Sequence, residues 1–352
     1  MDVLTPKQVM FFHNAIKILE GSGNQVLCTS RHYREAVELA KLKALDLKII
    51  GAHGGAERFE KLRASANRVR ELAEIIHQFK PDVAIAFSSP EAARVAYGLG
   101  IPHIGFNDSP HAEAVGRLTV PLMNLLYTPW IIPYRLWTEF GLPRSRIEHY
   151  HALDPAAWLK TSQNETNNFA EEKDRKRKIL VRMEEEKAAY IADKRLRVDI
   201  SLIDSLVGKF SESAEINILC RYEDQIERIS AKYDGKARVI QQVIDGTELI
   251  RSVDIFIGGG GTMTTEAALL GKPTISIAPF TFLVEDYLER VGLAWRAGSP
   301  ASLLKLVRKM LDDNAFEKRQ KRVADRLLAR MEDPTEKIVQ AATTKWAKPD
   351  KF

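Results

Sequence analysis

The fold of this chain is decided by residues 254–277, which read Asp254-Ile-Phe-Ile-Gly-Gly-Gly-Gly-Thr-Met-Thr-Thr-Glu-Ala-Ala-Leu-Leu-Gly-Lys-Pro-Thr-Ile-Ser-Ile. The apolar run 255–257 predicts a buried strand, and four glycines follow it at 258–261. Glycine permits positive φ and a close approach of ligand to backbone. The helical pattern of 262–270 then ends at Gly271, a typical C-terminal stop. The stretch therefore predicts a strand, a glycine-rich turn and a helix.

A turn of this kind favours binding of phosphate, because free N–H groups and the helix dipole converge at a helix N-terminus. We expect a nucleotide diphosphate at this turn, and its backbone contacts to come from Gly259, Gly260, Gly261, Thr262 and Met263. Glu266 follows one helical turn later, where a carboxylate would repel phosphate but accept hydrogen bonds from the two hydroxyls of a ribose. The alternative is a glycine-rich turn that only permits close packing.

Other nucleotide motifs are missing from the sequence. The turn does not end in the Gly-Lys-Ser/Thr of a Walker A loop, and it is not a spaced G-x-G-x-x-G fingerprint at the start of a domain. These features disfavour an ATPase or a dehydrogenase. The sequence also contains no Asp-x-Asp motif of the kind that holds a metal ion beside a nucleotide, so we expect neither a metal site nor a cofactor.

Composition indicates an ordinary soluble protein. A chain of 352 residues, 45% hydrophobic and 28% charged, is long enough for two α/β domains. Its two cysteines, Cys28 and Cys220, lie in apolar runs and are interpreted as core residues in a reducing compartment. The formal charge of +5 favours anionic partners. Without a signal peptide or a membrane-spanning run, the cytoplasm is the expected location.

Strand patterns alternate with helix patterns along the whole chain. Buried parallel strands are predicted at 26–29, 47–50, 83–87 and 103–106, and again at 179–181, 216–219, 238–240, 255–257 and 274–277. This alternation predicts two doubly wound, Rossmann-like domains. The polar stretch 161–178 is interpreted as a linker or insertion, so the domains are expected at 1–160 and 179–330, with a C-terminal helix and tail at 331–352.

The first strand is short for such a domain. Only Val3 and Leu4 precede Thr5-Pro6, so either the strand is truncated or the natural product begins upstream of Met1. The turn after a first strand faces the ligand-binding edge of a doubly wound sheet. Lys7 is therefore a candidate anion contact, with a solvated lysine in the first turn of a helix as the alternative.

The chain resembles a known family at several separate motifs. These are Gly259-Gly-Gly-Thr-Met-Thr-Thr-Glu, Ser89-Pro-Glu-Ala-Ala-Arg, Phe106-Asn-Asp-Ser-Pro-His, Leu4-Thr-Pro-Lys-Gln and His53-Gly-Gly. They resemble an uncharacterised prokaryotic domain-of-unknown-function family, related to UDP-N-acetylglucosamine 2-epimerases and to the lipid-linked N-acetylglucosaminyltransferase of cell-wall synthesis. The resemblance covers nearly the whole chain. It implies a glycosyltransferase-B fold, with an acceptor-side first domain facing a cleft and a nucleotide-sugar-binding second domain.

The resemblance extends to particular residues. Gly260 to Met263 match the positions where the epimerases bind diphosphate, and Glu266 matches their ribose-binding glutamate. After the first strand of the second domain, the epimerases have His-Arg-Arg-Glu-Asn where this chain has Val181-Arg-Met-Glu-Glu. The histidine is absent, which disfavours epimerase chemistry, while Arg182 and Glu184 are plausible cleft residues.

Candidate catalytic residues follow the strand that ends near Phe106. Asp108 and His111 stand where the cleft of such a domain forms, and either is a candidate base for an acceptor hydroxyl. An Asx turn at Asp108 and a capped loop histidine are the alternatives. Glu113, in Glu113-Ala-Val-Gly-Arg-Leu-Thr, resembles one of an acidic pair in the epimerases, whose second acid is Ala114 here. His53 is a weaker candidate, since glycines also mark a plain turn.

Two surface segments bear on partners. The apolar segment 118–140, with Trp130, Tyr134 and Trp137, is interpreted either as a peripheral contact with the inner face of the membrane or as core. The basic residues of 318–330 are interspersed with acidic residues, and no series of aromatic residues accompanies them. Both features disfavour nucleic-acid binding.

We therefore predict a transferase that uses a UDP-sugar, such as UDP-N-acetylglucosamine, and transfers the sugar to a glycan or lipid-linked acceptor in surface-glycan synthesis. An epimerase-like enzyme and a noncatalytic nucleotide-sugar sensor or scaffold are the alternatives. The sequence does not indicate the acceptor or the oligomeric state.

Overall fold

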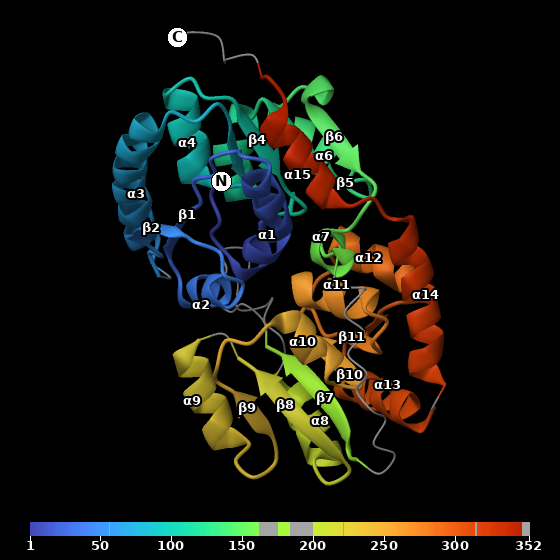
Figure 1. Cartoon of the computed structure of the whole chain (residues 1–352). Helices are drawn as coiled ribbons and strands as arrows, with labels where there is room; N and C mark the ends of the chain where they lie inside the picture. Colours follow the sequence, from blue (N-terminus) through green and yellow to red (C-terminus); the bar gives the residue numbers. More distant parts are fainter. Residues whose placement is uncertain (56, 162–174, 184–199, 221, 314, 347–352) are drawn as a thin grey trace. The chain divides into compact units, whose positions relative to one another are not determined.

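The computed structural model describes residues 1–55, 57–161, 175–183, 200–220, 222–313 and 315–346. The chain divides into two compact units (Figure 1). The first comprises residues 1–158 together with 332–352, and the second comprises residues 159–331. The C-terminal segment thus returns to the first unit, where helix α15 (Pro334–Thr343) packs on α1 (Pro6–Gly21).

The second unit contains a parallel sheet in the order β12-β11-β10-β7-β8-β9. This is the doubly wound order, with the direction of winding reversing between β7 and β10. Its strands are β7 (Arg177–Arg182), β8 (Ala214–Leu219), β9 (Arg238–Ile240), β10 (Ile255–Gly258), β11 (Thr274–Ser276) and β12 (Trp295–Arg296). Its helices are α8 (Ile200–Phe210), α9 (Glu223–Lys232), α10 (Gly246–Arg251), α11 (Thr262–Leu269), α12 (Leu283–Arg290), α13 (Pro300–Asp312) and α14 (Phe316–Arg330).

Hydrophobic side chains of the central strands pack on both faces of this sheet, because successive side chains of a strand point to opposite faces. Ile255 and Ile257 of β10 pack in one cluster with α8 and α13. Phe256, between them, packs in a second cluster with Ala267 of α11. A central strand buried on both faces therefore carries the glycine-rich turn at its carboxyl end.

The first unit contains a four-stranded parallel sheet, β3-β4-β5-β6, and a parallel pair, β1-β2. The strands are β1 (Thr29–His32), β2 (Lys48–Ala52), β3 (Ala84–Ala86), β4 (His103–Phe106), β5 (Leu125–Pro129) and β6 (Ile147–Tyr150). The remaining helices are α2 (Arg34–Leu42), α3 (Arg58–Phe79), α4 (Pro90–Gly98), α5 (Glu113–Thr119), α6 (Arg135–Thr138) and α7 (Ala156–Leu159), with 3₁₀ turns η1 (Val120–Leu122) and η2 (Arg144–Arg146).

A single residue, Asp2, joins the two sheets of the first unit. It forms isolated parallel bridges to Thr29 of β1 and to Ala86 of β3, so it stands where the first strand of a doubly wound sheet belongs. Its carboxylate accepts hydrogen bonds from the buried Arg68 of α3 and from Thr29. The first strand is thus as short as the sequence indicates, and a buried ion pair helps to hold it.

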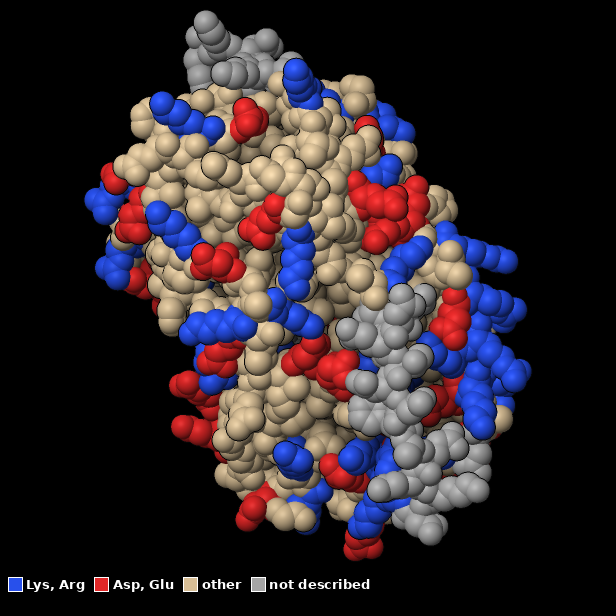
Figure 2. Space-filling model, in the orientation of Figure 1, with Lys and Arg blue, Asp and Glu red and all other residues tan. Residues whose placement is uncertain are grey.

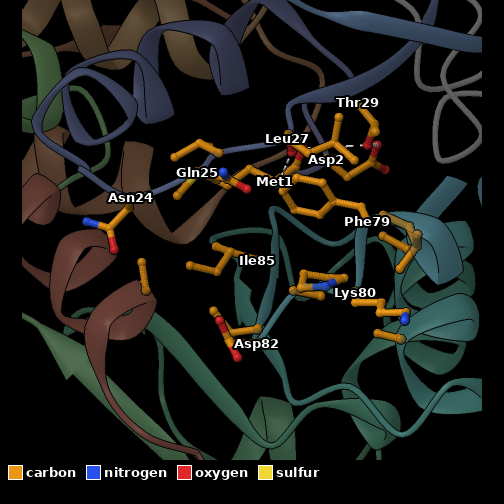
Figure 3. Close-up of a pocket in the computed structure, with 18 of the residues that line it drawn as sticks. Met1, Asp2, Asn24, Gln25, Leu27, Thr29, Phe79, Lys80, Asp82 and Ile85 are labelled. Carbon is orange, nitrogen blue, oxygen red and sulfur yellow. Dashed lines mark hydrogen bonds between the residues drawn. The ribbon is translucent and has the colours of Figure 1, made fainter. Parts of the chain in front are cut away.

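A cavity of about 390 Å³ lies next to this short strand (Figure 3). Met1, Gln25 and Leu27 border it from one side; Phe79 at the end of α3, Asp82 in the loop before β3 and Ile85 of β3 also line it. The Met1 ammonium donates to the Leu27 carbonyl at 2.6 Å. This cavity is at the amino ends of β1 and β3, whereas doubly wound sheets bind ligands at the carboxyl ends.

Most predicted elements are confirmed within a residue or two, but the strand expected at 26–29 is displaced. The structure places β1 at Thr29–His32, because its pairing with β2 begins at Thr29 and continues to His32. The apolar pattern marks burial, whereas strand boundaries depend on the pairing partners. The basic residues at 318–330 line the exposed face of α14 (Figure 2), whose buried face carries Phe316, Gln320, Ala324 and Leu328.

Candidate functional site

The glycine-rich turn is at the switch point of the second unit's sheet, where β10 meets β7. Gly258 pairs with Arg182 across the two strands. Gly260 and Gly261 both have positive φ, +98° and +83°, and Gly261 is the N-cap of α11. A β-carbon at Gly261 would find nothing within 4 Å, whereas one at Gly260 would lie 2.6 Å from Glu285 Oε1. Gly260 therefore permits internal packing, and Gly261 borders open space at the helix N-terminus.

Glu285 of α12 reaches this turn and was not found by sequence reasoning. Its Oε1 accepts a hydrogen bond from the Gly261 amide at 3.0 Å, and its Oε2 accepts one from Ser276 Oγ at 2.9 Å. Burial raises the pKa of Glu285, while Ser276, Gly261 and Arg296 oppose the rise. Since the Gly261 amide is already bonded to Glu285, the first helical amides, those of Thr262 and Met263, are the donors that α11 can offer to an anion.

Glu266 is buried on the same helix, with 4% of its surface exposed. Thr247 of α10 donates a hydrogen bond from its hydroxyl to Glu266 Oε1. A β-carbon built on Gly246 would stand 3.6 Å from the Met263 methyl group and 3.9 Å from Glu266 Oε2. The predicted ribose carboxylate thus stands beside the N-terminus of α10, at the carboxyl side of β9 and β10.

Arg182, the last residue of β7, lies next to the glycine-rich turn. Its backbone carbonyl accepts a hydrogen bond from the Gly259 amide at 3.4 Å, and its guanidinium donates to the Leu219 carbonyl at 3.1 Å. The structure thereby brings together Arg182, the glycine-rich turn and, one helical turn on, Glu266. Glu184, which the sequence also indicated, lies outside the described residues.

A second group of charged residues gathers at the carboxyl edge of the first unit's sheet. The Lys7 ammonium, at the start of α1, lies 2.6 Å from Asp108 Oδ2 and 2.6 Å from Asp154 Oδ2. The Tyr150 hydroxyl donates to the other oxygen of Asp154. Lys7 Nζ also stands 4.2 Å from the centre of the Phe87 ring. We call Lys7, Asp108, Asp154 and Tyr150 the lysine cluster.

Exposure differs among members of the lysine cluster. The side chain of Asp154 is 2% exposed and that of Asp108 is 20% exposed. Ser109 Oγ donates to Asp108 Oδ1 at 2.8 Å. The Asx turn expected at Asp108 belongs instead to Asn107, whose side chain accepts from the Ser109 amide at 2.8 Å. The Asp108 carboxylate is thus committed to charged and hydroxyl partners and is the more exposed of the two acids.

The two carboxyl groups titrate differently. Burial raises the pKa of Asp154 to about 7; Lys7 opposes this rise and the charge of Asp108 adds to it. Burial also acts to raise the pKa of Asp108, but the Lys7 ammonium and the hydrogen bonds to Asp108 outweigh it and hold that pKa below its ordinary value. Desolvation lowers the pKa of His111, against the charge of Asp108, which favours the neutral imidazole.

Two predicted residues lie in other settings. Glu113 is exposed on α5 and forms an ion pair with Arg117 of the same helix at 2.7 Å, so it does not join the lysine cluster. His53 Nδ1 accepts from the Gly55 amide at 3.1 Å, and its ring stacks on Tyr33. These contacts correspond to a plain turn at His53.

Sequence reasoning missed Asp154 and Tyr150. The motif His149-Tyr-His-Ala-Leu-Asp-Pro follows a predicted apolar segment and carries no glycine-rich signal. One signal could have identified Asp154: it is an acidic residue that follows a parallel strand and precedes a proline. The carboxyl end of such a strand is the ligand-binding edge of a doubly wound sheet. The ammonium partner of Asp154, Lys7, comes from the other end of the unit's sequence.

The apolar segment 118–140 largely forms core. Trp137 is fully buried and donates from Nε1 to Thr128 Oγ1 at 3.1 Å. The Tyr134 ring stacks on His149 at 3.8 Å, and the Trp130 ring on His151 at 4.8 Å. These packing roles explain the aromatic residues of the segment. Membrane contact stays a prediction.

Membrane-spanning helices and metal-binding clusters are both absent from the described ranges. None of the helices there has the length and apolar character that crossing a bilayer requires. The same residues contain no group of three or more His, Cys, Asp and Glu arranged to hold a metal ion.

Solved structures of low sequence identity share this fold. The UDP-GlcNAc 2-epimerase of Neisseria meningitidis bound to UDP-GlcNAc superposes with a TM-score of 0.70 at 16% identity, covering 97% of each chain. The Methanocaldococcus jannaschii UDP-GlcNAc 2-epimerase, in complex with UDP-GlcNAc and UDP, gives 0.67 at 17% identity, covering 93% of this chain and 98% of that one. The kitacinnamycin glycosyltransferase gives 0.60 at 14% identity over 97% and 96% of the two chains.

Two Rossmann-like units in one chain, similar along nearly their whole length to these enzymes, define a protein of the glycosyltransferase-B fold class. A curated relative, the uncharacterized protein MJ0665 of Methanocaldococcus jannaschii, is 29% identical over 303 residues, which cover 82% of this chain and 84% of that protein. The chain belongs to the DUF354 family of proteins of unknown function, whose model matches residues 1–345.

Proposed function

We propose that the protein is a nucleotide-sugar-dependent glycosyltransferase whose donor is a UDP-sugar, with UDP-N-acetylglucosamine as the first candidate. The observation that carries this proposal is the geometry at the switch point of the second unit. Gly261 leaves space at the N-terminus of α11, and the buried Glu266 lies one helical turn further along the same helix. Donors for a diphosphate and an acceptor for a ribose are thereby combined on one element.

The names of the structural neighbours support the choice of nucleotide. Two of the epimerases were solved with UDP-GlcNAc, one of them also with UDP. A diphosphate leaving group gains stabilisation from a helix N-terminus without proton transfer. The proposal therefore needs no metal ion, and a strict requirement of the reaction for a divalent cation would contradict it.

Epimerisation of the same donor is the second candidate. It is favoured by the TM-scores, which are 0.67 and 0.70 for the two epimerases and 0.60 for the glycosyltransferase. Against it stands Val181, which directly precedes Arg182 at the position where the resembling epimerase stretch has a histidine. Transfer requires only stabilisation of the diphosphate and a base for the acceptor hydroxyl, and the lysine cluster offers candidate carboxylates for that base.

Calorimetry followed by product analysis tests both candidates. Purified protein is titrated with UDP, UDP-N-acetylglucosamine and GDP, and ADP serves as the control for unspecific anion binding. Preferential binding of UDP and its sugar supports the proposal, and absence of binding to all four contradicts it. Incubation with UDP-N-acetylglucosamine alone then separates the candidates, because a 2-epimer forms without an acceptor only if the enzyme is an epimerase. Binding without turnover, with or without extracts that contain glycan and lipid acceptors, would indicate a sensor or scaffold.

A further inference from the structure

The lysine cluster brings two carboxyl groups to one ammonium. Asp108 Oδ2 and Asp154 Oδ2 each stand 2.6 Å from Lys7 Nζ, so both carboxyl groups contact the same ammonium. The three residues come from three places at the same edge of the sheet: the start of α1, the loop after β4 and the loop after β6. Two such groups share protons, since one ammonium does not neutralise two ionised carboxylates.

The two acids differ in burial and in hydrogen-bond partners. Asp154 is buried, and its second oxygen is held by the Tyr150 hydroxyl. Asp108 has the greater exposure and accepts from Ser109 Oγ. Two other groups face the pair. The Phe87 ring lies under the ammonium, and the pKa of the His111 imidazole is raised by the charge of Asp108 and lowered by that of Lys7.

We propose that Asp108 and Asp154 act as one proton-sharing pair beside Lys7, in which Asp108 receives the proton of a substrate hydroxyl and Asp154 is a positioning residue that retains it. In transfer, the hydroxyl oxygen bonds to the anomeric carbon as its O–H bond breaks. The bond from that carbon to the diphosphate breaks at the same time, and the leaving UDP takes the electron pair. The hydroxyl proton enters the pair. The substrate part of this inference rests on the proposed function.

Sharing would make the pair a better base than Asp108 alone. Lys7 holds the pKa of Asp108 below its ordinary value, so that carboxylate by itself is a weak base. The pKa of Asp154, which burial raises to about 7, means that the doubly ionised pair takes up one proton near neutral pH. A base is most effective when its pKa lies near the working pH.

The test is a titration of the carboxyl carbons by ¹³C NMR, on protein labelled at the aspartate carboxyl groups. Asp108→Asn and Asp154→Asn assign the two signals. In the wild type, we expect the signals of both residues to move together in a step near pH 7. In Asp154→Asn, that step should be lost from the Asp108 signal. In Tyr150→Phe, it should persist at a higher pH, because the lost hydroxyl favoured the ionised form of Asp154.

Asp204 provides a matched control in the second unit. It also accepts from a tyrosine hydroxyl, that of Tyr233 at 2.8 Å, and pairs with Lys232 at 2.8 Å, but its side chain is 41% exposed. Asp204→Asn should leave the step near pH 7 unchanged. The proposal is overturned if the wild-type Asp108 signal lacks that step, or keeps it in a folded Asp154→Asn variant. Should Asp154→Asn not fold, an unshifted step in Tyr150→Phe would overturn it as well.

The two proposals can fail separately. If the wild type binds no UDP in calorimetry, the proposed function fails while the shared titration can still be observed. If it binds UDP but the carboxyl signals titrate independently, the proton-sharing pair fails and the function stands. Where UDP release from UDP-N-acetylglucosamine can be followed, its rate should increase through pH 7 in the wild type and lose this increase in Asp154→Asn.

Discussion

At the scale of single residues, neighbouring glycines have different reasons to be glycine. Gly260 has no room for a β-carbon, because Glu285, Phe282 and Ala278 surround it within 3.3 Å. Gly261 has room, but its φ of +83° is one that side chains rarely adopt. The first position therefore serves packing, and the second is the one where an added side chain would meet a ligand.

Gly261→Val should weaken UDP binding at least about tenfold, or 1.4 kcal/mol, because the branched side chain occupies the space in front of the α11 amides. Isothermal calorimetry measures the change. Gly235→Val is the matched control: Gly235 also has positive φ, +67°, with nothing within 4 Å of an added β-carbon. It introduces similar backbone strain away from the turn. Equal UDP affinity in the two variants would contradict a phosphate site at Gly261.

Glu266→Ala should weaken UDP binding by about 1–3 kcal/mol, the usual range for hydrogen bonds to a charged group. The surroundings of Glu266 are consistent with this prediction. Thr247 donates a hydrogen bond to one oxygen of its carboxylate, and the side chain is buried on α11. Glu248→Ala, which removes a more exposed carboxylate of α10, serves as the control. An unchanged calorimetric affinity for Glu266→Ala would remove Glu266 from the site.

At the scale of elements, the start of α1 links three parts of the first unit. Thr5 caps the helix by accepting from the Gln8 amide, and Pro6 occupies the first turn. The buried Gln8 side chain accepts from the Leu4 amide at 2.6 Å and donates to the Phe87 carbonyl at 3.1 Å. Gln8 thereby joins the short first strand to the end of β3 and fixes the turn that carries Lys7.

Gln8→Ala should destabilise the first unit by about 2–4 kcal/mol, since it leaves a buried amide and a buried carbonyl unpaired, at about 1–3 kcal/mol each. Urea unfolding measures the change. Gln78→Ala, on the exposed face of α3, should stay within about 0.5 kcal/mol of the wild type. A Gln8 variant as stable as the Gln78 variant would show that these two hydrogen bonds contribute little.

At the scale of the whole molecule, each unit contains a carboxylate held by arginine. Asp2 of the first unit pairs with the buried Arg68, and Asp254 of the second accepts from Arg175, Arg177 and the Lys178 amide. Burial acts to raise the pKa of both acids, but hydrogen bonds and the charges of the arginines outweigh it and hold both pKa values below 3.8. Such groups stabilise the fold fully above the unfolded pKa and lose that contribution as the pH falls through the folded one.

Acid should therefore destabilise both units. In the second unit, Asp254→Asn should show how much the ionised Asp254 carboxylate contributes to stability. At pH 6 the variant is expected to be less stable than the wild type, because the ionised carboxylate is lost. Below pH 3.8 the difference should shrink, since the wild-type carboxylate becomes protonated as well. Urea unfolding between pH 3 and 6 measures both, with the exposed Asp312→Asn as the control. A difference independent of pH would contradict the ionic origin of the effect.

The sequence predicted the elements whose signals are local. The run 255–257, the glycines and the helix after them appear as β10, the turn and α11 within one residue, because each depends on near neighbours along the chain. The position of β1 was wrong by three residues at its start, since strand boundaries depend on pairing with distant strands. Glu285 was missed for the same reason: nothing near it in sequence indicates that it contacts Gly261.

By itself, the sequence determined the two doubly wound units and the place of the glycine-rich turn, because hydrophobic period and glycine spacing are local features of the chain. The family was indicated by the resemblance of separate motifs, such as Gly259-Gly-Gly-Thr-Met-Thr-Thr-Glu. Only the tertiary structure decided that Lys7 joins Asp108 to Asp154 and that the C-terminal helix packs on α1. These arrangements depend on which strand ends and helices become neighbours in the folded unit. Parallel strands bring together residues that are far apart in sequence, and no local pattern records that proximity.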